Sequence, residues 1–351
     1  MTTALSLPHP RHPDPADAPA LRWGILAPGW IASNFARAVH THTAQRVVAV
    51  GSRSASRAEE FAARFEIPRA HEGYEAVLAD REVDAVYVAS PHSEHREQAL
   101  AAIAAGKHVL VEKAFTRNAA EAREVIAAGR AAGVLVMEAM WSRYLPHVDV
   151  LRQLLDDGAL GDVHRVEADF GSRAQVPPTH RLLDPALAGG VLLDLGVYPL
   201  AFASFVARHA GAGPLPAGAG LQVAGALAPT GVDAQVSLQI AVGHLHAALF
   251  TTMLAETPQT ATVSGSLARV ALGHKFYAPG PLTLTRGTET VTWDENRIVD
   301  LDGLAFQAAA LARFVAEGRT ESPLQPLAET LEILEVADAA RATLGVRYPH
   351  E

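Results

Sequence analysis

The sequence has no cysteine among its 351 residues, and it has neither a cluster of basic residues nor a long apolar run. The lack of cysteine excludes disulfides, thiolate metal sites and cysteine nucleophiles, and it favours a reducing, cytoplasmic location. The formal charge of −9, with Lys and Arg dispersed, argues against nucleic acid or an anionic membrane as a partner. No apolar run approaches the ~20 residues that a membrane-spanning helix needs.

The organisation of the chain follows from its length and from its first residues. Residues 1–20 are rich in proline and lack the basic and then apolar pattern of a signal peptide, so we expect a disordered leader there. With 49% hydrophobic and 19% charged residues, the chain is long enough to bury two cores. We predict one domain over residues 21–140 and a second over residues 141–351.

The stretch Arg22–Arg53 has the pattern of a strand, a turn, a helix and a second strand. Such a unit needs about 30 residues, and a turn of small residues lets a pyrophosphate bind the first N–H groups of the helix. The dinucleotide fingerprint G-x-G-x-x-G is degenerate, with Ala27, Gly29 and Ala32 in the glycine positions, and alanine at the first is costly if its φ is positive. The residues that we assign to the cofactor here are Ala27, Gly29, Trp30 and Ile31.

The loop after the second strand bears on which dinucleotide binds. Where an enzyme specific for NAD places Asp or Glu against the ribose 2′-hydroxyl, this chain has Ser52 and Arg53. A guanidinium suits a 2′-phosphate, so we predict NADP(H) in preference to NAD(H), with Arg57 in the same site. The alternative is that Arg53 is a solvated loop cation and that Ser54 or Ser56 only caps the next helix, since Ser56 with Glu59 has the pattern of a capping box.

Strands and helices continue to alternate up to about residue 140. We expect helices over residues 56–65, 94–105 and 118–133, and strands over residues 85–89, 108–112 and 134–137. Because these strands lack a period of two, they predict a parallel sheet covered on both faces. The first domain is therefore predicted to be α/β and doubly wound.

In such sheets ligands bind beyond the carboxyl ends of the strands. The residues of this crevice that we assign to cofactor binding are Ser90, Pro91, His92, His95, Glu112 and Lys113. A lysine at the end of a buried strand needs a carboxylate or a ligand, unless it simply leaves the sheet edge into water. His92 and His95 have alternatives as a turn residue and a helix-face residue. Glu138 follows the last strand, but no spacing argument supports it as a cleft residue.

The second half of the chain has a different pattern. A helix over residues 143–157 leads to an alternating strand over residues 163–170, and helices over residues 304–317 and 326–344 close the chain. Between them we expect strands over residues 221–227, 233–242, 246–254, 259–264, 268–272, 282–285 and 289–293. This pattern predicts an α+β domain with a large, predominantly antiparallel, open-faced sheet. A second subunit is the economical cover for the open face, so we expect a homodimer or a higher homo-oligomer.

The segment over residues 189–200 is a second chemical centre. If it is helical, Asp194 and Tyr198 are four residues apart and share one face, although Pro199 predicts a kink. An aspartate inside an apolar run is costly unless a positive or protic group meets it. The structural alternative is that Asp194 caps a helix or neutralises Lys113, and that Tyr198 is a core aromatic residue.

Several of these runs resemble a known family. The runs Leu21–Ala36, Val88–His95 and Ala105–Lys113 are similar to the glucose-fructose oxidoreductase, inositol dehydrogenase and MocA family, whose signature is an apolar strand that ends in Glu-Lys-Pro. This chain departs from the signature at Ala114. The segments that resemble the branch of the dimeric dihydrodiol dehydrogenases and NADP-dependent D-xylose dehydrogenases are Trp141, Arg181–Pro185, Gly189–Gly190, Asp194, Tyr198 and Arg347–Pro349.

The resemblance implies a Rossmann domain, an open-faced sheet domain, dimerisation through that sheet, and oxidation of a ring hydroxyl of a sugar or cyclic diol with NADP⁺. The reaction needs a base for the hydroxyl proton. Tyr198 can serve if Lys113 lowers its pKa, or Lys113 can serve while Tyr198 orients the substrate. Asp194 and Arg181 are assigned to the substrate hydroxyls, and Trp141 is assigned to an apolar wall.

Two other functions stay open at this point. The chain could be a non-catalytic sensor of NADP(H) or sugar, although Lys113, Asp194 and Tyr198 speak against it. A metal enzyme is the third interpretation, but the pairs His40 with His42 and His244 with His246 lack a metal-binding pattern, so we assign no metal. The substrate itself and the physiological direction are not encoded in any motif.

Overall fold

The computed structural model describes residues 5–349 and residue 351, which form two compact units. We call residues 13–144 and 300–331 the parallel-sheet unit. The described residues of 1–12, 145–299 and 332–351 are the open-sheet unit. The boundary expected near residue 140 differs from this division at residues 300–331. That segment belongs to the parallel-sheet unit because Val136 of the sheet donates to the carbonyl of Thr320 at 3.0 Å.

The parallel-sheet unit contains six parallel strands in the order β3-β2-β1-β4-β5-β6. The strands are β1 (Arg22–Leu26), β2 (Arg46–Ser52), β3 (Arg69–Glu72), β4 (Ala85–Val88), β5 (His108–Val111) and β6 (Val136–Glu138). This is the order of a doubly wound dinucleotide-binding sheet, with its switch point between β1 and β4. The predicted parallel α/β architecture is confirmed, whereas β3 lay outside the predicted strands.

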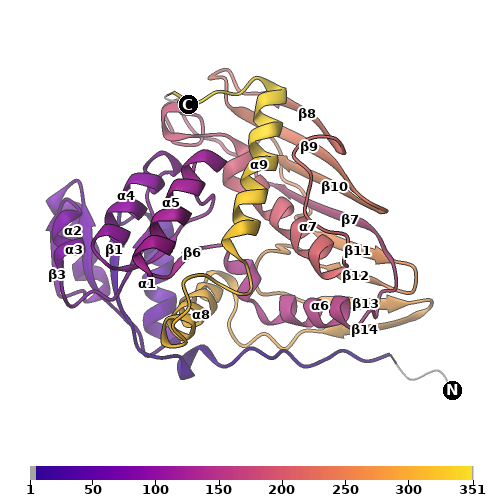
Figure 1. Cartoon of the computed structure of the whole chain (residues 1–351), viewed down its shortest axis with the longest axis horizontal. Coiled ribbons are helices and arrows are strands. Elements are labelled where there is room, and N and C mark those ends of the chain that lie inside the picture. The colour runs from indigo at the N-terminus through magenta and orange to yellow at the C-terminus, as the bar shows by residue number, and fades with distance from the viewer. Residues whose placement is uncertain (1–4, 350) are drawn as a thin grey trace. The chain divides into compact units, whose positions relative to one another are not determined.

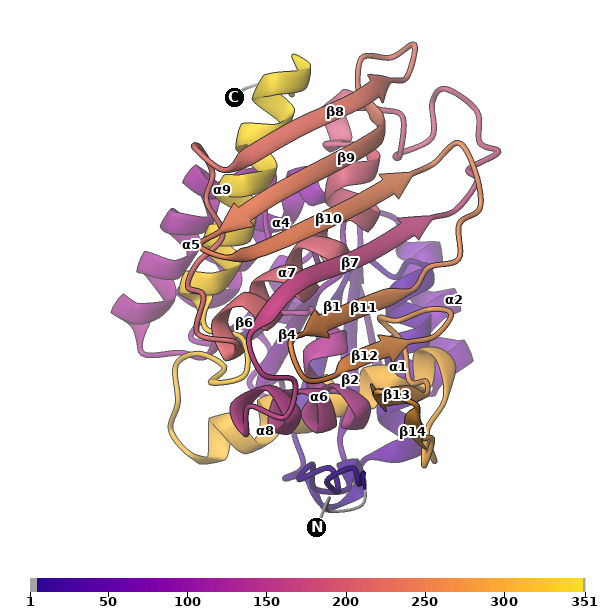
Figure 2. The same cartoon turned by 90° about the vertical axis from the view of Figure 1, so that its right-hand side faces the viewer.

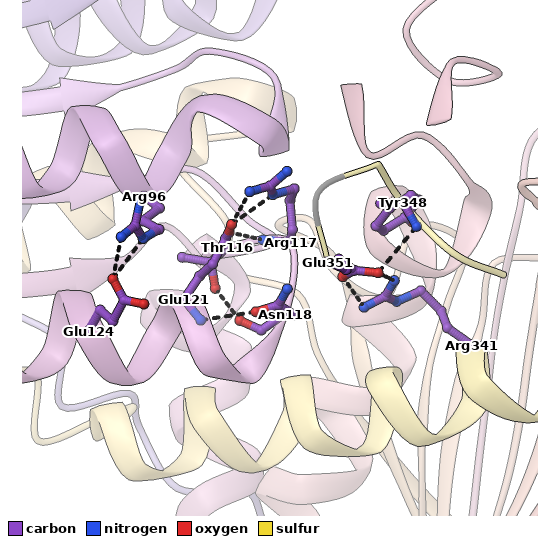
Figure 3. Close-up of polar contacts among 9 residues, drawn as sticks. All are labelled: Arg96, Thr116, Arg117, Asn118, Glu121, Glu124, Arg341, Tyr348 and Glu351. Atoms are coloured by element: carbon purple, nitrogen blue, oxygen red, sulfur yellow. Dashed lines mark hydrogen bonds and ion pairs between the residues drawn. The ribbon is translucent and has the colours of Figure 1, made fainter. Parts of the chain in front are cut away.

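Helices accompany this sheet, as Figure 1 shows for α4 and α5. The helices of the unit are α1 (Trp30–His42), α2 (Ala55–Phe65), α3 (Glu75–Ala79), α4 (His92–Ala104), α5 (Ala119–Ala132) and α8 (Leu304–Ala316). Short 3-10 turns add η1 (Pro15–Asp17), η2 (Trp141–Tyr144) and η5 (Asp300–Gly303). The start expected for α5 is confirmed, since the Asn118 side chain accepts a hydrogen bond from the Glu121 amide at 2.9 Å (Figure 3). Of the two serines expected to cap α2, Ser54 is its extended N-cap, without a side-chain cap, and the capping box expected at Ser56 is wrong.

Aromatic side chains fill the core of the parallel-sheet unit. Phe35 of α1 stacks on Tyr87 of β4 at 4.0 Å between ring centroids, and it meets Trp23 of β1 edge to face at 5.1 Å. The Trp23 indole N–H donates to Gln45 at 2.6 Å, so its polar atom is satisfied in the core. The Tyr87 hydroxyl donates to the Glu112 carboxylate, which links the core to the end of β5.

The open-sheet unit contains eight strands in the order β14-β13-β12-β11-β7-β10-β9-β8, and Figure 2 shows them face on. The strands are β7 (Val163–Gly171), β8 (Leu221–Leu227), β9 (Asp233–Val242), β10 (Leu245–Thr252), β11 (Ala261–Gly265), β12 (Arg269–Leu272), β13 (Leu282–Arg286) and β14 (Glu289–Trp293). All neighbouring pairs are antiparallel except β7 with β10. The predicted open-faced, predominantly antiparallel sheet is confirmed.

The helices of this unit cover one face of the sheet, with α6 and α7 behind it in Figure 2. They are α6 (Pro146–Asp156), the 3-10 turn η3 (Pro185–Leu187), the π-helical turn η4 (Leu192–Gly196), α7 (Val197–His209) and residues 332–344 of α9 (Leu327–Leu344). Side chains of β9 alternate, since Val236, Leu238 and Ile240 are buried while Gln239 is exposed. One face of the sheet is thus apolar and packed, and the other carries polar and small residues.

One expectation about a segment needs revision. Residues 5–20 do not follow the predicted disorder, because Arg11 pairs with Asp149 at 3.0 Å in the open-sheet unit and Asp14 accepts from Arg313 at 2.6 Å in the parallel-sheet unit. Residues 1–4 of the expected leader lie outside the described residues. Among the described residues one helical stretch, Pro185–His209, has the length and apolar composition of a membrane span, but 89% of its apolar window is buried inside the protein.

Candidate active site

The turn after β1 presents the entrance of α1. Ala27 has φ 67°, so the alanine that replaces the first fingerprint glycine does take the costly left-handed conformation. Gly29 is the N-cap of α1 without a side-chain cap, and the next three N–H groups have no acceptor within the helix. Trp30 is 71% exposed. Ala27, Gly29, Trp30 and Ile31 therefore form an exposed turn at a helix N-terminus, as a pyrophosphate site requires.

The two arginines assigned to the 2′-phosphate follow β2, with Arg53 in the loop and Arg57 in α2. Arg53 and Arg57 are exposed, and the Ser52 hydroxyl accepts from the Ser54 amide at 3.2 Å. Sequence analysis missed Tyr74, which follows β3. Its ring lies so close to Gly51 that a Cβ there would be 3.1 Å from the ring. The positive charges of Arg53 and Arg57 oppose the burial that raises the pKa of the Tyr74 phenol, so Tyr74 shares their surroundings.

The candidate residues that follow β4 differ in position and in burial. Pro91 is the N-cap of α4, and His92 is its first helical residue, 6% exposed. His95 has no exposed surface, and its ring nitrogens lie 2.9 Å from the carbonyl oxygens of Ser90 and Ala114. The assignment of His95 to direct cofactor binding therefore needs correction, because its ring links two loops of the sheet. Burial lowers the pKa of His95, whereas its contacts with the carbonyl oxygens of Ser90 and Ala114 raise it.

The two candidate residues after β5, Glu112 and Lys113, also differ in their surroundings. Glu112 is 6% exposed and accepts from the Tyr87 hydroxyl and from the Lys113 amide at 3.2 Å. These contacts make Glu112 a buried support for the strand end, which corrects its assignment to the cofactor. Lys113 is half-buried, and the peptide bond between Lys113 and Ala114 is cis. Trp141, assigned to the substrate, is 3% exposed in η2 of the same unit.

The second chemical centre lies in the open-sheet unit, where η4 continues directly into α7. Asp194 is in the π-helical turn, and Tyr198 is the second residue of α7. Pro199 stands in the first turn of α7, where its missing N–H breaks no bond of that helix. The irregularity expected at the proline appears as the π-helical turn before it, a feature frequent at functional sites. Arg181 forms an ion pair with Asp194 at 3.1 Å, so the structure joins two of the predicted substrate residues.

The start of η4 is held by residues that sequence analysis missed. The buried Asp233 carboxylate of β9 accepts from the Leu192 amide at 2.6 Å. A Cβ at Gly190, whose φ is 118°, would lie 2.3 Å from this carboxylate. The Tyr348 hydroxyl donates to the Gly189 carbonyl at 2.7 Å. The glycine pair is thus required by close approach, and it was the one signal of this support in the sequence.

The C-terminal segment that carries Tyr348 is fixed in turn. Arg341 of α9 donates to the Glu351 carboxylate at 3.0 Å, and Glu351 accepts from the Tyr348 amide at 3.2 Å (Figure 3). The Arg341 guanidinium also lies 4.4 Å from the centre of the Tyr348 ring. Tyr348 therefore reaches Gly189 from a rigid anchor.

An aromatic wall surrounds Tyr198. Phe170 of β7 and Tyr277 stack at 4.2 Å with an interplanar angle of 11°, and Tyr277 lies 4.9 Å from Tyr198 between ring centroids. The Tyr277 hydroxyl donates to Gln259 at 3.2 Å, and burial raises its pKa to about 12. Tyr277 belongs to the loop over residues 273–281, between β12 and β13. Phe170 carried no signal in the sequence beyond strand alternation.

The histidine pairs weighed as metal ligands have other contacts. His40 accepts a hydrogen bond from the Val47 amide at 3.0 Å, and His42 lies 3.1 Å from Asp302. The ring of His244 meets that of His164 at 5.5 Å. Across the described ranges, the structure contains no group of three or more histidine or carboxylate side chains placed to hold a metal ion.

Comparisons with known proteins agree with this geometry. Residues 21–140 match the oxidoreductase family with an NAD-binding Rossmann fold, and residues 148–271 match the GFO/IDH/MocA C-terminal domain. The trans-1,2-dihydrobenzene-1,2-diol dehydrogenase of Mus musculus is 35% identical over 339 residues, which cover 95% of this chain and 99% of that protein. The human protein of the same name is 33% identical over 347 residues, with coverage of 95% and 99%.

A solved structure of a 3-ketoreductase from Actinomadura kijaniata, in complex with NADP and TDP-benzene, is 27% identical with a TM-score of 0.78. It covers 92% of this chain and 98% of its own. The sheet order, the exposed helix entrance after β1 and the matches over both units lead to one assignment. The chain belongs to the GFO/IDH/MocA family of oxidoreductases with an NAD-binding Rossmann domain.

Proposed function

We propose that this protein is an NADP(H)-dependent oxidoreductase that moves hydride between the nicotinamide and a ring hydroxyl or carbonyl of a sugar or cyclic diol. The observation that carries the proposal is its similarity to dihydrodiol dehydrogenases over 99% of their length. The 3-ketoreductase crystallised with NADP supports the choice of cofactor. The cysteine-free chain supports a cytoplasmic location.

The preference for NADP(H) rests on the loop after β2. Arg53 on this loop and Arg57 in α2 are exposed. The chain has Ser52 and Arg53 where an enzyme specific for NAD carries a carboxylate. Two guanidinium groups can pair with a 2′-phosphate, whereas they offer little to a 2′-hydroxyl. Tyr74 adds an aromatic surface beside these charges. NAD(H) is the expected second choice because it lacks the group that the arginines bind.

We assign the proton transfer to Lys113 and Tyr198, with Asp194 and Arg181 on the substrate hydroxyls. The bound nicotinamide would accept or supply the hydride. Lys113 and Tyr198 are the two candidates for the base that takes the hydroxyl proton. The ion pair between Arg181 and Asp194 supports a hydrogen-bonding role for that pair, since each offers a charged group to a hydroxyl.

The aromatic wall formed by Phe170, Tyr198 and Tyr277 supports a ring-shaped substrate. Stacked aromatic faces bind the apolar face of a sugar or of a cyclic diol. Trp141 of the parallel-sheet unit stays a separate candidate for contact with the substrate. The polar pair Arg181 and Asp194 then provides contacts for hydroxyl groups. This combination suits a small cyclic polyol or diol better than a linear one.

We also propose that the protein forms a homodimer, or a higher homo-oligomer, through the open face of the eight-stranded sheet. No described helix of the open-sheet unit covers that face (Figure 2). Its residues include Ser237, Ala248 and Thr262, which are small and partly exposed, together with Phe250. Small residues allow two flat sheets to approach closely.

The experiment follows NADPH absorbance with NADP⁺ and with NAD⁺ against aldopyranoses, inositol and a cyclic trans-diol. Turnover of at least one ring substrate, with NADP⁺ preferred, is the expected result. Tight NADPH binding without turnover of any member of the panel would favour the non-catalytic sensor. Faster turnover with NAD⁺ than with NADP⁺ would contradict the assignment of Arg53 and Arg57.

A further inference from the structure

The buried carboxyl of Glu138 has no part in the mechanism above. Glu138 is the last residue of β6 and is 4% exposed. A carboxylate at this depth is costly without donors. Its oxygens accept hydrogen bonds from the Gln325 amide at 2.7 Å, the Thr330 hydroxyl at 2.8 Å and the Phe115 backbone N–H at 3.2 Å. Through Phe115, this carboxyl reaches the segment that carries Lys113.

We propose that Glu138 is a positioning residue for Lys113, and that it acts by holding the backbone of the Lys113–Phe115 segment. The proposal rests on the proposed function, because it takes Lys113 as the group to be positioned. Glu138 itself contacts neither cofactor nor substrate in this mechanism. Its effect passes through the Phe115 amide.

Each residue of the Lys113–Phe115 segment has a backbone group held by a buried side chain. Glu112 accepts from the Lys113 amide at 3.2 Å, the His95 ring lies 2.9 Å from the Ala114 carbonyl, and Glu138 accepts from the Phe115 amide. These side chains come from the end of β5, from α4 and from β6. A loop held from three elements keeps the lysine side chain on a fixed base, which positioned catalysis requires.

Two of the three donors to Glu138 come from one segment in the last part of the chain. Gln325 and Thr330 belong to the segment over residues 320–331, which returns to β6 within the parallel-sheet unit. The same segment is anchored beside Glu138, because Tyr144 donates to Ser322 at 2.9 Å and Arg143 pairs with Glu329. The segment over residues 320–331 therefore supports Glu138, and Glu138 in turn supports the Lys113–Phe115 segment.

The proton on Glu138 gives this support a pH dependence. Burial raises the pKa of Glu138 to about 7, while the Thr330 hydrogen bond lowers it. The charged and titratable groups that face it are Arg143 and Tyr144 from η2 and Glu329 from α9. The ionised carboxylate accepts the Phe115 N–H more strongly than the protonated form does. Lysine positioning should therefore improve as the pH rises through about 7.

The test compares the pH profile of kcat for the wild type, Thr330→Val and Glu138→Gln at saturating NADP⁺ and substrate. The wild type should rise through about pH 7, and Thr330→Val should move that inflection to higher pH because it removes a donor to the carboxylate. Glu138→Gln should lose the inflection, since an amide does not titrate. The proposal is overturned if both variants keep the wild-type inflection.

A truncation measures the size of the effect. Glu138→Ala should lower kcat about 10-fold or more, while the Kd for NADPH changes by less than about 2-fold, because a misplaced catalytic group costs rate and not cofactor affinity. The matched control is Glu121→Gln, which alters another buried carboxylate of this unit that binds Arg117 (Figure 3). This control should leave the inflection in place.

Amide hydrogen exchange at Phe115 separates this inference from the proposed function, since it needs no turnover. Exchange should be slow in the wild type at pH 8, faster in Glu138→Ala, and unchanged in the Glu121→Gln control. If the wild type turns over no substrate while Phe115 behaves in this way, the proposed function fails and the contact stands. Equal exchange in the wild type and Glu138→Ala would overturn the inference. If Glu138→Ala does not fold, exchange at Phe115 is measured in Thr330→Val instead.

Discussion

The two units support their proposed catalytic residues by different physical means. In the parallel-sheet unit, three buried polar side chains hold the backbone beside Lys113, and one of them, Glu138, can carry a proton. In the open-sheet unit, the turn with Asp194 is held by close backbone packing at Gly190 and by a capping carboxylate, Asp233. The first support should respond to pH, and the second should fail through steric change.

The largest effect should come from Lys113→Met. Loss of the ammonium should lower kcat by about 10²–10⁴-fold, because it removes one of the two candidates for the general base. The Kd for NADPH, measured by fluorescence titration, should stay within about 3-fold of the wild type. Turnover close to the wild-type rate would show that Lys113 is not the catalytic residue of the parallel-sheet unit.

The next effect is steric and tests the open-sheet unit. Gly190→Ala places a Cβ 2.3 Å from the Asp233 carboxylate at a φ of 118°, so it should lower the free energy of unfolding by about 2–4 kcal/mol in urea. Gly218→Ala is the matched control, because a Cβ there meets nothing within 4 Å. A similar loss in both variants would show that the glycine at 190 is not required by close approach.

Glu138→Gln should alter how stability depends on pH. The pKa of Glu138 is raised from 4.5 to about 7 in the folded state, so its contribution is fully present below about pH 4.5 and is lost as the pH rises to about 7. The wild type should therefore lose up to about 3 kcal/mol from this group between pH 4.5 and 8, and the variant should not. Parallel unfolding curves against pH for both proteins would contradict this account.

The smallest effect should come from the exposed loop after β2. Arg53→Asp should weaken NADP⁺ by about 10- to 100-fold, because a charge-assisted contact is lost and a repulsive one appears. NAD⁺ should change by less than about 3-fold, as judged from kcat/KM for both cofactors. Equal weakening of the two would place Arg53 outside the phosphate site and leave Arg57 as the remaining candidate.

Much of the architecture followed from local patterns. Apolar strands without alternation predicted the parallel sheet, alternating ones predicted the open sheet, and Asn118 with Gly133 marked the two ends of α5. Short elements such as β3 and α3 were missed, because four or five residues hold too little periodicity to stand out. The capping box at Ser56 failed because Ser54, two residues earlier, already had the extended N-cap conformation.

The candidate site was predictable only in part, because local patterns locate a residue along the chain but do not show what packs against it. Residues at strand ends, such as Lys113, and the loop with Arg53 could be located from the order of strands and helices. The burial of a side chain could not be predicted from that order. Glu112 and His95 were therefore assigned to the cofactor, although their side chains bind other groups of the protein. Whether a polar side chain at a strand end faces a ligand or a neighbouring loop depends on what packs beside it.

The sequence by itself determined the two sheets, the helix entrance after β1 and the chemical types available at each strand end, because periodicity and turn chemistry act over a few residues. Only the tertiary structure decided which distant groups support them. Asp233 meets Leu192 across 41 positions, and Thr330 meets Glu138 across 192. Such contacts form when the chain packs, since a buried polar atom must then find a partner wherever the fold supplies one.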